Sequence, residues 1–147
     1  MRGPNPLKKI SLFKGLTRIE LALLESRVTR TRFPENTVVI REGETSDSMF
    51  VILSGKVRVF RKDDKGGEVT IDFMGKGDYF GEYAMLDGSK RSASVVTTEA
   101  SDFMVISKDT MIDLFGESPD MAFSLIRDLV TRIRELNFAL ERLESKK

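Results

Sequence analysis

Gly81 to Val95, with the sequence GEYAMLDGSKRSASV, is the stretch that says most about this chain. Gly81 and Glu82 open what reads as one helical turn, and the backbone N–H groups at such a start favour an anion. Arg91 then stands among small residues, where its forked donors match two oxygens of a phosphate. The carboxylate of Glu82 cannot bind a phosphate, but it accepts hydrogen bonds from sugar hydroxyls. The segment therefore predicts a pocket for one phosphate and one sugar.

The spacing of these residues resembles the phosphate-binding cassette of the cyclic nucleotide-binding domain. That domain occurs in bacterial catabolite activator proteins and in the regulatory subunits of cyclic AMP-dependent kinase. The family pattern, roughly F-G-E-x-A and then R-small-A-x-V, is matched by Phe80, Gly81, Glu82, Ala84, Arg91, Ser92, Ala93 and Val95. The match is specific because several residue types are required at fixed offsets. The resemblance runs from about Leu12 to the end of the chain.

Composition limits the classes of function. The chain has 147 residues and a net charge of +1, which suggests one domain and gives no global field for nucleic acid or membrane. It has no cysteine and no histidine, so thiolate catalysis, an imidazole base and the usual zinc sites are excluded. No apolar run approaches the about 20 residues of a membrane span, and no signal peptide is visible. We therefore expect a cytoplasmic domain that is not an enzyme and holds no metal or cofactor.

The apolar pattern divides the chain into helical ends and a β-rich middle. The expected parts of a single domain are a loose arm at 1–6, N-terminal helices at 7–31, a barrel at 32–106 containing the cassette at 81–95, and C-terminal helices at 107–147. Short runs rich in β-branched and aromatic residues predict strands at 37–42, 49–53, 56–60, 68–73, 93–98 and 102–106. With the resemblance, this indicates a mainly β fold: a jelly-roll β-barrel with N-terminal helices and a long C-terminal helix.

Capping signals mark the starts of three helices. Thr17 with Glu20 forms a capping-box pattern. Ser107 can cap a short helix that ends near Gly116. Ser118, followed by Pro119 and a carboxylate, is a strong start signal for the last helix.

The last helix carries a heptad pattern. Apolar residues recur with alternating spacings of four and three at Ala122, Ile126, Leu129, Ile133, Leu136, Leu140 and Leu143. A second set lies off this seam and can pack on the chain's own barrel: Phe123, Leu125, Val130 and Phe138. A helix with two apolar faces has one for its own fold and one for a partner, so we expect a parallel homodimer through it. The alternative is a helix that packs only on its own barrel.

The resemblance implies a role for each cassette residue. Arg91, with Ser92 and Ala84, would hold the cyclic phosphate. Glu82, with Gly81, would hold the ribose through its 2′-hydroxyl. The alternative for Arg91 is an ordinary surface arginine, and the alternative for Glu82 is a carboxylate that merely favours the start of a helix.

The resemblance also indicates where the base would lie. By register from the cassette, Val59 and Ile71 resemble residues of the barrel wall that the base contacts. On the C-terminal helix, Leu136 and Asn137 take the positions of the polar pair that meets the base in the activator family, and Arg132 falls where that family can place an arginine near the glutamate. Asn137 can still bond an adenine edge, although a solvent-facing helix residue is the alternative.

The residue after the cassette arginine bears on which nucleotide binds. In the kinase families, threonine after the cassette arginine favours guanine and alanine favours adenine; the activator family tolerates serine there with cyclic AMP. We therefore expect cyclic AMP rather than cyclic GMP. The chain stops soon after the heptad seam, so we expect a stand-alone sensor with no direct nucleic-acid binding. Its ligand would reposition the C-terminal helix for an unidentified downstream protein. The alternatives are a ligand-free dimerisation or scaffold module, a truncated activator-type transcription regulator, and an enzyme on a barrel scaffold.

Overall fold

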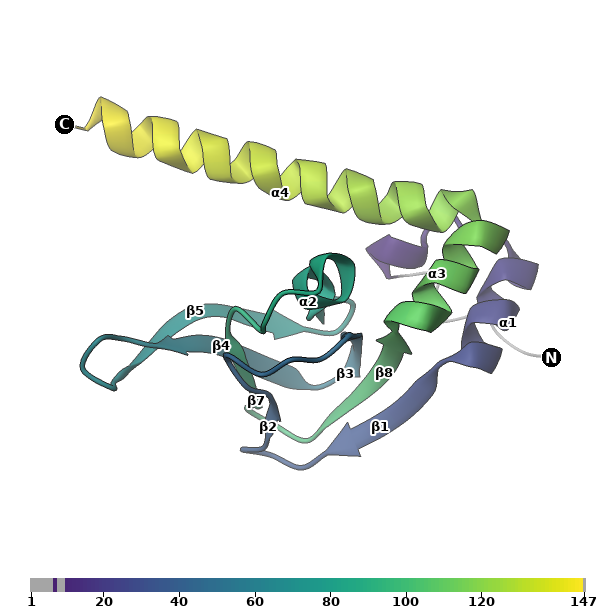
Figure 1. Cartoon of the computed structure of the whole chain (residues 1–147), viewed down its shortest axis with the longest axis horizontal. Coiled ribbons are helices and arrows are strands. Elements are labelled where there is room, and N and C mark those ends of the chain that lie inside the picture. The colour runs from purple at the N-terminus through teal and green to yellow at the C-terminus, as the bar shows by residue number, and fades with distance from the viewer. Residues whose placement is uncertain (1–6, 8–9, 147) are drawn as a thin grey trace. The chain divides into compact units, whose positions relative to one another are not determined.

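The computed structural model describes residue 7 and residues 10–146, and within them eight strands form two antiparallel sheets. The strands are β1 Thr29–Phe33, β2 Val38–Ile40, β3 Ser48–Ser54, β4 Lys56–Lys62, β5 Glu68–Gly75, β6 Tyr79–Phe80, β7 Ser94–Thr97 and β8 Ser101–Ser107. One sheet has the order β1-β8-β3-β6 and the other β2-β7-β4-β5 (Figure 1). This confirms the mainly β, jelly-roll class, although the described strands do not close into a barrel.

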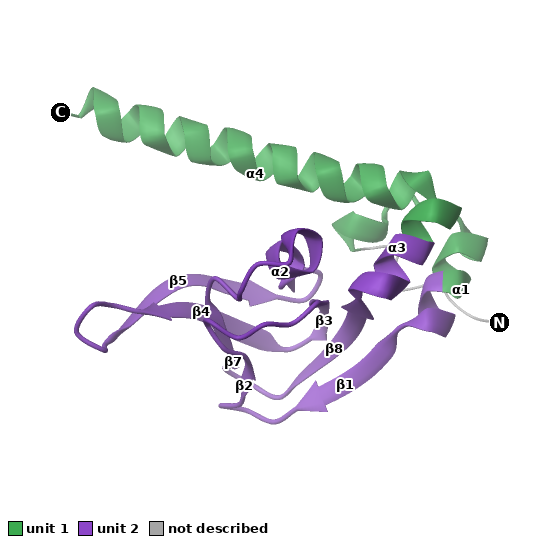
Figure 2. Cartoon of the chain, viewed as in Figure 1, with its two compact units in different colours: residues 1–23, 114–147 green, residues 24–113 purple. Residues whose placement is uncertain are grey.

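The helices comprise the 3₁₀ turn η2 Ser11–Phe13, α1 Arg18–Arg27, α2 Glu82–Asp87, α3 Lys108–Glu117 and α4 Pro119–Ser145. The chain divides into a β unit, residues 24–113, and a helical unit, residues 1–23 with 114–147 (Figure 2). In the helical unit η2 contacts α4, and the buried residues of α4 are Met121, Ser124 and Leu125 near its start.

The predicted helix starts are confirmed with one difference. The Thr17 N–H donates to Glu20 Oε1 at 3.0 Å and the Glu20 N–H donates to Thr17 Oγ1 at 3.2 Å, which completes the capping box. The Thr110 N–H donates to Ser107 Oγ at 3.2 Å. Ser118 lies at the N-cap of α4 with a proline following it, but its side chain makes no capping hydrogen bond with the described residues.

The core of the β unit is built from both sheets. Its fully buried members are Ile52, Phe80 and Phe103 from one sheet and Val57 and Val95 from the other. Phe50 stacks on Phe80 with a centroid distance of 5.2 Å, and Phe103 meets both rings edge-on. Because Phe80 immediately precedes Gly81, this aromatic cluster holds the start of the cassette.

The structure corrects the sequence prediction at three places. Residues 29–31, assigned to the helical range 7–31, belong to β1 and pair with β8. The two residues of β6 were not predicted, since so short a strand leaves no alternation to detect. The run 68–73 alternates apolar and polar residues, as a half-buried strand does, but in β5 these six residues are all exposed. The arm predicted at 1–6 lies outside the described residues.

The apolar residues of α4 differ in exposure along its length. Of the four residues off the seam, Leu125 is buried, whereas Phe123, Val130 and Phe138 are exposed. Five seam residues are 54 to 64% exposed: Ile126, Ile133, Leu136, Leu140 and Leu143. None of the helices in the described part of the chain has the length and apolarity needed to cross a bilayer.

Candidate functional site

Arg91 is a buried arginine whose charge is met by backbone carbonyls. Arg91 is only 4% exposed to solvent. Nη1 donates to the Gly81 carbonyl at 3.0 Å and Nη2 donates to the Ser48 carbonyl at 2.7 Å. The Nε–H is buried and has no hydrogen-bond partner among the described residues. Because an unpaired buried donor is costly, an anion that reached the Nε–H would remove that cost.

The electrostatic surroundings of Arg91 are mixed. Burial lowers the pKa of the guanidinium from its ordinary value, because a charged group is disfavoured away from water. The carboxylates of Asp47, Glu44 and Glu82 oppose that shift and raise the pKa. The guanidinium remains charged at neutral pH, and none of the ion pairs between described residues includes it.

The backbone of Arg91 is fixed on both sides by the turn between β2 and β3. The Arg91 N–H donates to the Glu44 carbonyl at 2.8 Å, and the Gly43 N–H donates to the Arg91 carbonyl at 2.9 Å. Two parts of the chain that are far apart in sequence therefore position this arginine before any ligand arrives.

Gly81 is required by the close approach of the Arg91 side chain. Its φ is +86°, and a Cβ there would lie 2.7 Å from Arg91 Nη1 and 3.0 Å from the Ser48 carbonyl oxygen. The resemblance assigns Gly81, with Glu82, to the ribose of the ligand. The structure adds a reason inside the protein itself, since a side chain would displace the guanidinium.

The cassette helix α2 carries the second polar group of the site. It begins at Glu82, which is 3% exposed, and Ala84 on the same helix is also buried. In chain order α2 lies between β6 and β7, in the segment that leads to Arg91. The Glu82 carboxylate acts electrostatically on Arg91. A buried cation and a buried carboxylate thus share one region of the β unit.

Three of the five predicted cassette residues are buried in the structure: Glu82, Ala84 and Arg91. Gly81 is partly exposed, and its carbonyl accepts from Arg91. Ser92 is adjacent in sequence, but it is exposed. Sequence reasoning missed Ser48, whose backbone carbonyl accepts from Arg91. A carbonyl acceptor is independent of residue type, so no sequence signal could have found it.

Two of the predicted base contacts, Val59 and Ile71, lie on β4 and β5, outside the cassette. Val59 packs partly buried against the core. Ile71 is about half exposed and lies at an irregularity in the β4–β5 pairing, where Val59 is opposite Asp72 and Phe60 opposite Thr70. Their role remains a prediction.

The other three predicted base contacts, Arg132, Leu136 and Asn137, lie on α4 in the helical unit. Leu136 and Asn137 are exposed there. Their contact with a base also remains a prediction.

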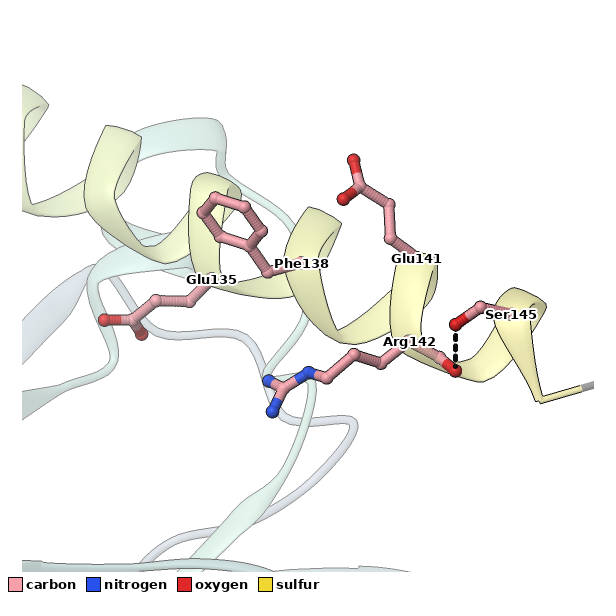
Figure 3. Close-up of a pocket in the computed structure, with 5 residues that line it drawn as sticks. All are labelled: Glu135, Phe138, Glu141, Arg142 and Ser145. Carbon is pink, nitrogen blue, oxygen red and sulfur yellow. Dashed lines mark hydrogen bonds between the residues drawn. The ribbon is translucent and has the colours of Figure 1, made fainter.

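Outside the cassette, we searched the described residues for metal-binding groups and surface hollows. They contain no group of three or more His, Cys, Asp or Glu side chains that could hold a metal ion. A surface hollow on α4 is lined by Glu135, Phe138, Glu141, Arg142 and Ser145 (Figure 3). All five come from one helix, and none is a predicted site residue.

Comparison with known proteins identifies the family. The sequence profile of the cyclic nucleotide-binding domain matches residues 30–118, a range that contains the whole cassette. The chain therefore belongs to the cyclic nucleotide-binding domain family, which confirms the resemblance.

Three relatives show how far the similarity extends. The cyclic AMP receptor protein of Thermus thermophilus is 32% identical over 137 residues, which cover 93% of this chain and 63% of the relative. The crystal structure of the Thermus thermophilus catabolite activator protein matches with a TM-score of 0.85 and 32% identity over 91% of this chain and 63% of that one. A cGMP-dependent protein kinase of Drosophila melanogaster is 32% identical over 113 residues, 75% of this chain and 12% of the kinase. The chain thus spans less than two thirds of the length of these relatives.

Substitution of Gly81 by alanine tests the close approach. We expect Gly81→Ala to lower the free energy of unfolding by about 2–4 kcal/mol, because backbone strain and displacement of Arg91 add together. Gly88→Ala is the matched control, since Gly88 ends the same helix at φ +72° with no described atom within 4 Å of a built Cβ. The Gly88→Ala substitution should lower the free energy of unfolding by only about 1 kcal/mol. If urea denaturation shows that Gly81→Ala and Gly88→Ala lose equal free energies of unfolding, Gly81 is not required by the close approach of Arg91.

Proposed function

We propose that the cassette binds a cyclic nucleotide, with cyclic AMP favoured over cyclic GMP, and that the chain acts as a ligand sensor rather than an enzyme. One observation carries the proposal: the buried guanidinium of Arg91 keeps an Nε donor without a partner among the described residues. Family membership supports the same conclusion.

The chemistry of the site fits a cyclic phosphate. Arg91 now bonds two neutral carbonyls, and a phosphate oxygen would offer it a charge-assisted bond, which is about twice as strong. The carboxylates of Asp47, Glu44 and Glu82 act on the same guanidinium, so a phosphate with two negative charges would be repelled more than a cyclic diester with one. Glu82 can accept the hydrogen bond of a ribose hydroxyl.

The proposed preference for cyclic AMP rests on two residues. It depends on Ser92, which stands between the residues that favour each purine in the kinase families, and on Asn137, which can offer an acceptor and a donor to adenine. The relatives include one named for cyclic AMP and one named for cyclic GMP.

The proposed output is a change in the position of α4. A ligand that binds better when both the β unit and α4 contact it would shift α4, and a downstream protein would detect that shift. Support comes from the division of the chain into two compact units, with α4 in the helical one.

The second part of the proposal is that the chain forms a parallel homodimer through α4. Such a dimer would also form if the chain were a scaffold module that binds no ligand. Five seam residues are more than half exposed. Ile126 and Ile133 occupy the a positions of the first two repeats, and Leu129 and Leu136 the d positions. This combination favours two parallel strands.

Replacement of Arg91 tests the phosphate assignment. We expect Arg91→Leu to weaken cyclic AMP binding by about 2–5 kcal/mol in calorimetry, because the phosphate charge would be left unpaired in a partly dry site. Arg91→Lys retains a charge but lacks the Nε–H, and it should also bind weakly. The control is Lys90→Leu at the exposed neighbouring position, which should bind as wild type. Unchanged affinity in folded Arg91→Leu would remove this arginine from the mechanism.

A ligand lacking one hydroxyl tests the role of Glu82. Wild-type protein should bind 2′-deoxy-cyclic AMP more weakly than cyclic AMP by about 1–3 kcal/mol, since the buried carboxylate loses its hydrogen bond from the ribose. Glu82→Ala should bind the two ligands almost equally. If wild-type protein does not discriminate between them in calorimetry, the ribose assignment is wrong.

Charges in the heptad seam test the dimer. Wild-type protein should sediment as a dimer, and Ile133→Glu with Leu140→Glu should sediment as a monomer, because four carboxylates would face one another across the seam. Arg134→Glu changes a charge beside the seam and should leave the dimer intact. A wild-type monomer at about micromolar concentration would rule out this interface.

A further inference from the structure

Arg61 is a second arginine held against the cassette. It lies on β4, is exposed, and its Nε–H donates to the Ser92 carbonyl at 3.0 Å. Among the described residues this is the one hydrogen bond of the Arg61 side chain, so both of its terminal nitrogens still have donors to offer. Ser92 directly follows Arg91 in the chain.

A comparison with Arg58 on the same strand shows that this arrangement is not a general property of arginines on β4. Arg58 donates to Glu68 at 2.9 Å and to Thr70 at 3.2 Å, and its guanidinium lies 4.7 Å from the centre of the Phe60 ring. Arg58 and Arg61 are three residues apart on a strand, so they project from opposite faces. The Arg58 guanidinium therefore bonds side chains of the neighbouring strand β5, whereas the Arg61 side chain bonds the backbone of the cassette.

Two hydrogen bonds to side chains connect the end of β4, next to Arg61, with the segment that follows Arg91. The Lys62 N–H donates to Glu42 Oε1 at 3.1 Å, and the Glu42 N–H donates to Ser94 Oγ at 2.8 Å. These bonds join the end of β4 to the segment that follows Arg91. An anchored side chain loses less conformational entropy when it binds a ligand.

The charges around Arg91 supply a reason for a second cation. An anion bound to Arg91 also experiences the three carboxylates that act on that guanidinium, Asp47, Glu44 and Glu82. One positive charge against three negative ones would bind a phosphate weakly unless another cation offset the repulsion. Arg61 is a cation anchored to Ser92, the residue that follows Arg91, and its terminal donors remain available.

We propose that Arg61 is a second anion-contacting arginine of the cassette: Ser92 holds its Nε–H, and its terminal nitrogens donate to a phosphate oxygen of the ligand bound by Arg91. The inference rests on the proposed cyclic nucleotide function and adds a determinant of affinity to it. Because every cyclic nucleotide has the same phosphate, Arg61 contributes equally whatever the base.

The test compares matched variants on three ligands at two salt concentrations. Wild type, Arg61→Gln, Arg61→Lys and Arg58→Gln are titrated with cyclic AMP, cyclic GMP and cyclic CMP by calorimetry in low and in moderate salt. Arg61→Gln should weaken each measurable affinity by the same factor, about five- to tenfold, and should reduce the dependence of affinity on salt. Arg61→Lys should keep the salt dependence of wild type, and Arg58→Gln should match wild type throughout.

Three results would overturn the assignment. Affinity of Arg61→Gln within about twofold of wild type would show that the phosphate does not meet this charge. A loss in Arg61→Gln matched by Arg58→Gln, with wild-type salt dependence, would show that β4 was merely perturbed. If wild-type protein binds none of the three nucleotides, the proposed function fails together with the inference; if it binds and Arg61→Gln binds equally, only the inference fails.

Discussion

The burial of one positive charge constrains the rest of the β unit. Arg91 is almost inaccessible to water, and a buried charge is tolerated only where polar groups surround it. The carbonyls of Gly81 and Ser48 supply that environment, and the absence of a side chain at Gly81 makes room for it. Neutral carbonyls stabilise a guanidinium less than an anion does. The site is therefore organised around a charge that a ligand can satisfy better than the protein does.

Three separate parts of the chain converge to hold this charge. The aromatic cluster around Phe80 fixes the start of the cassette, the turn between β2 and β3 fixes the backbone of Arg91, and β4 contacts Ser92 through Arg61. A jelly roll brings such distant segments together because neighbouring strands in each sheet are mostly not neighbours in sequence. The site is preorganised by the same pairings that form the fold, which lowers the entropic cost of binding.

Sequence could predict the features that depend on residue type and could not predict those that depend on backbone or position. The cassette was recognisable because glycine, glutamate and arginine occur at fixed offsets, and the capping box because Thr17 and Glu20 bond each other's backbone. The Ser48 carbonyl left no signal, and neither did the irregular pairing that accommodates Ile71. β1 was missed because its alternating threonines and arginines carry little apolar character. The base contacts predicted for Arg132, Leu136 and Asn137 rest on the resemblance alone, and these three residues lie on α4.

A crystal structure of the protein with cyclic AMP is the most direct test of the central claim. The account predicts an exocyclic phosphate oxygen within about 3.2 Å of Arg91 Nε, and a ribose hydroxyl at a similar distance from the Glu82 carboxylate. It would be contradicted by a nucleotide bound elsewhere on the chain, or by an Arg91 that still contacts only the carbonyls of Gly81 and Ser48 when the nucleotide is bound.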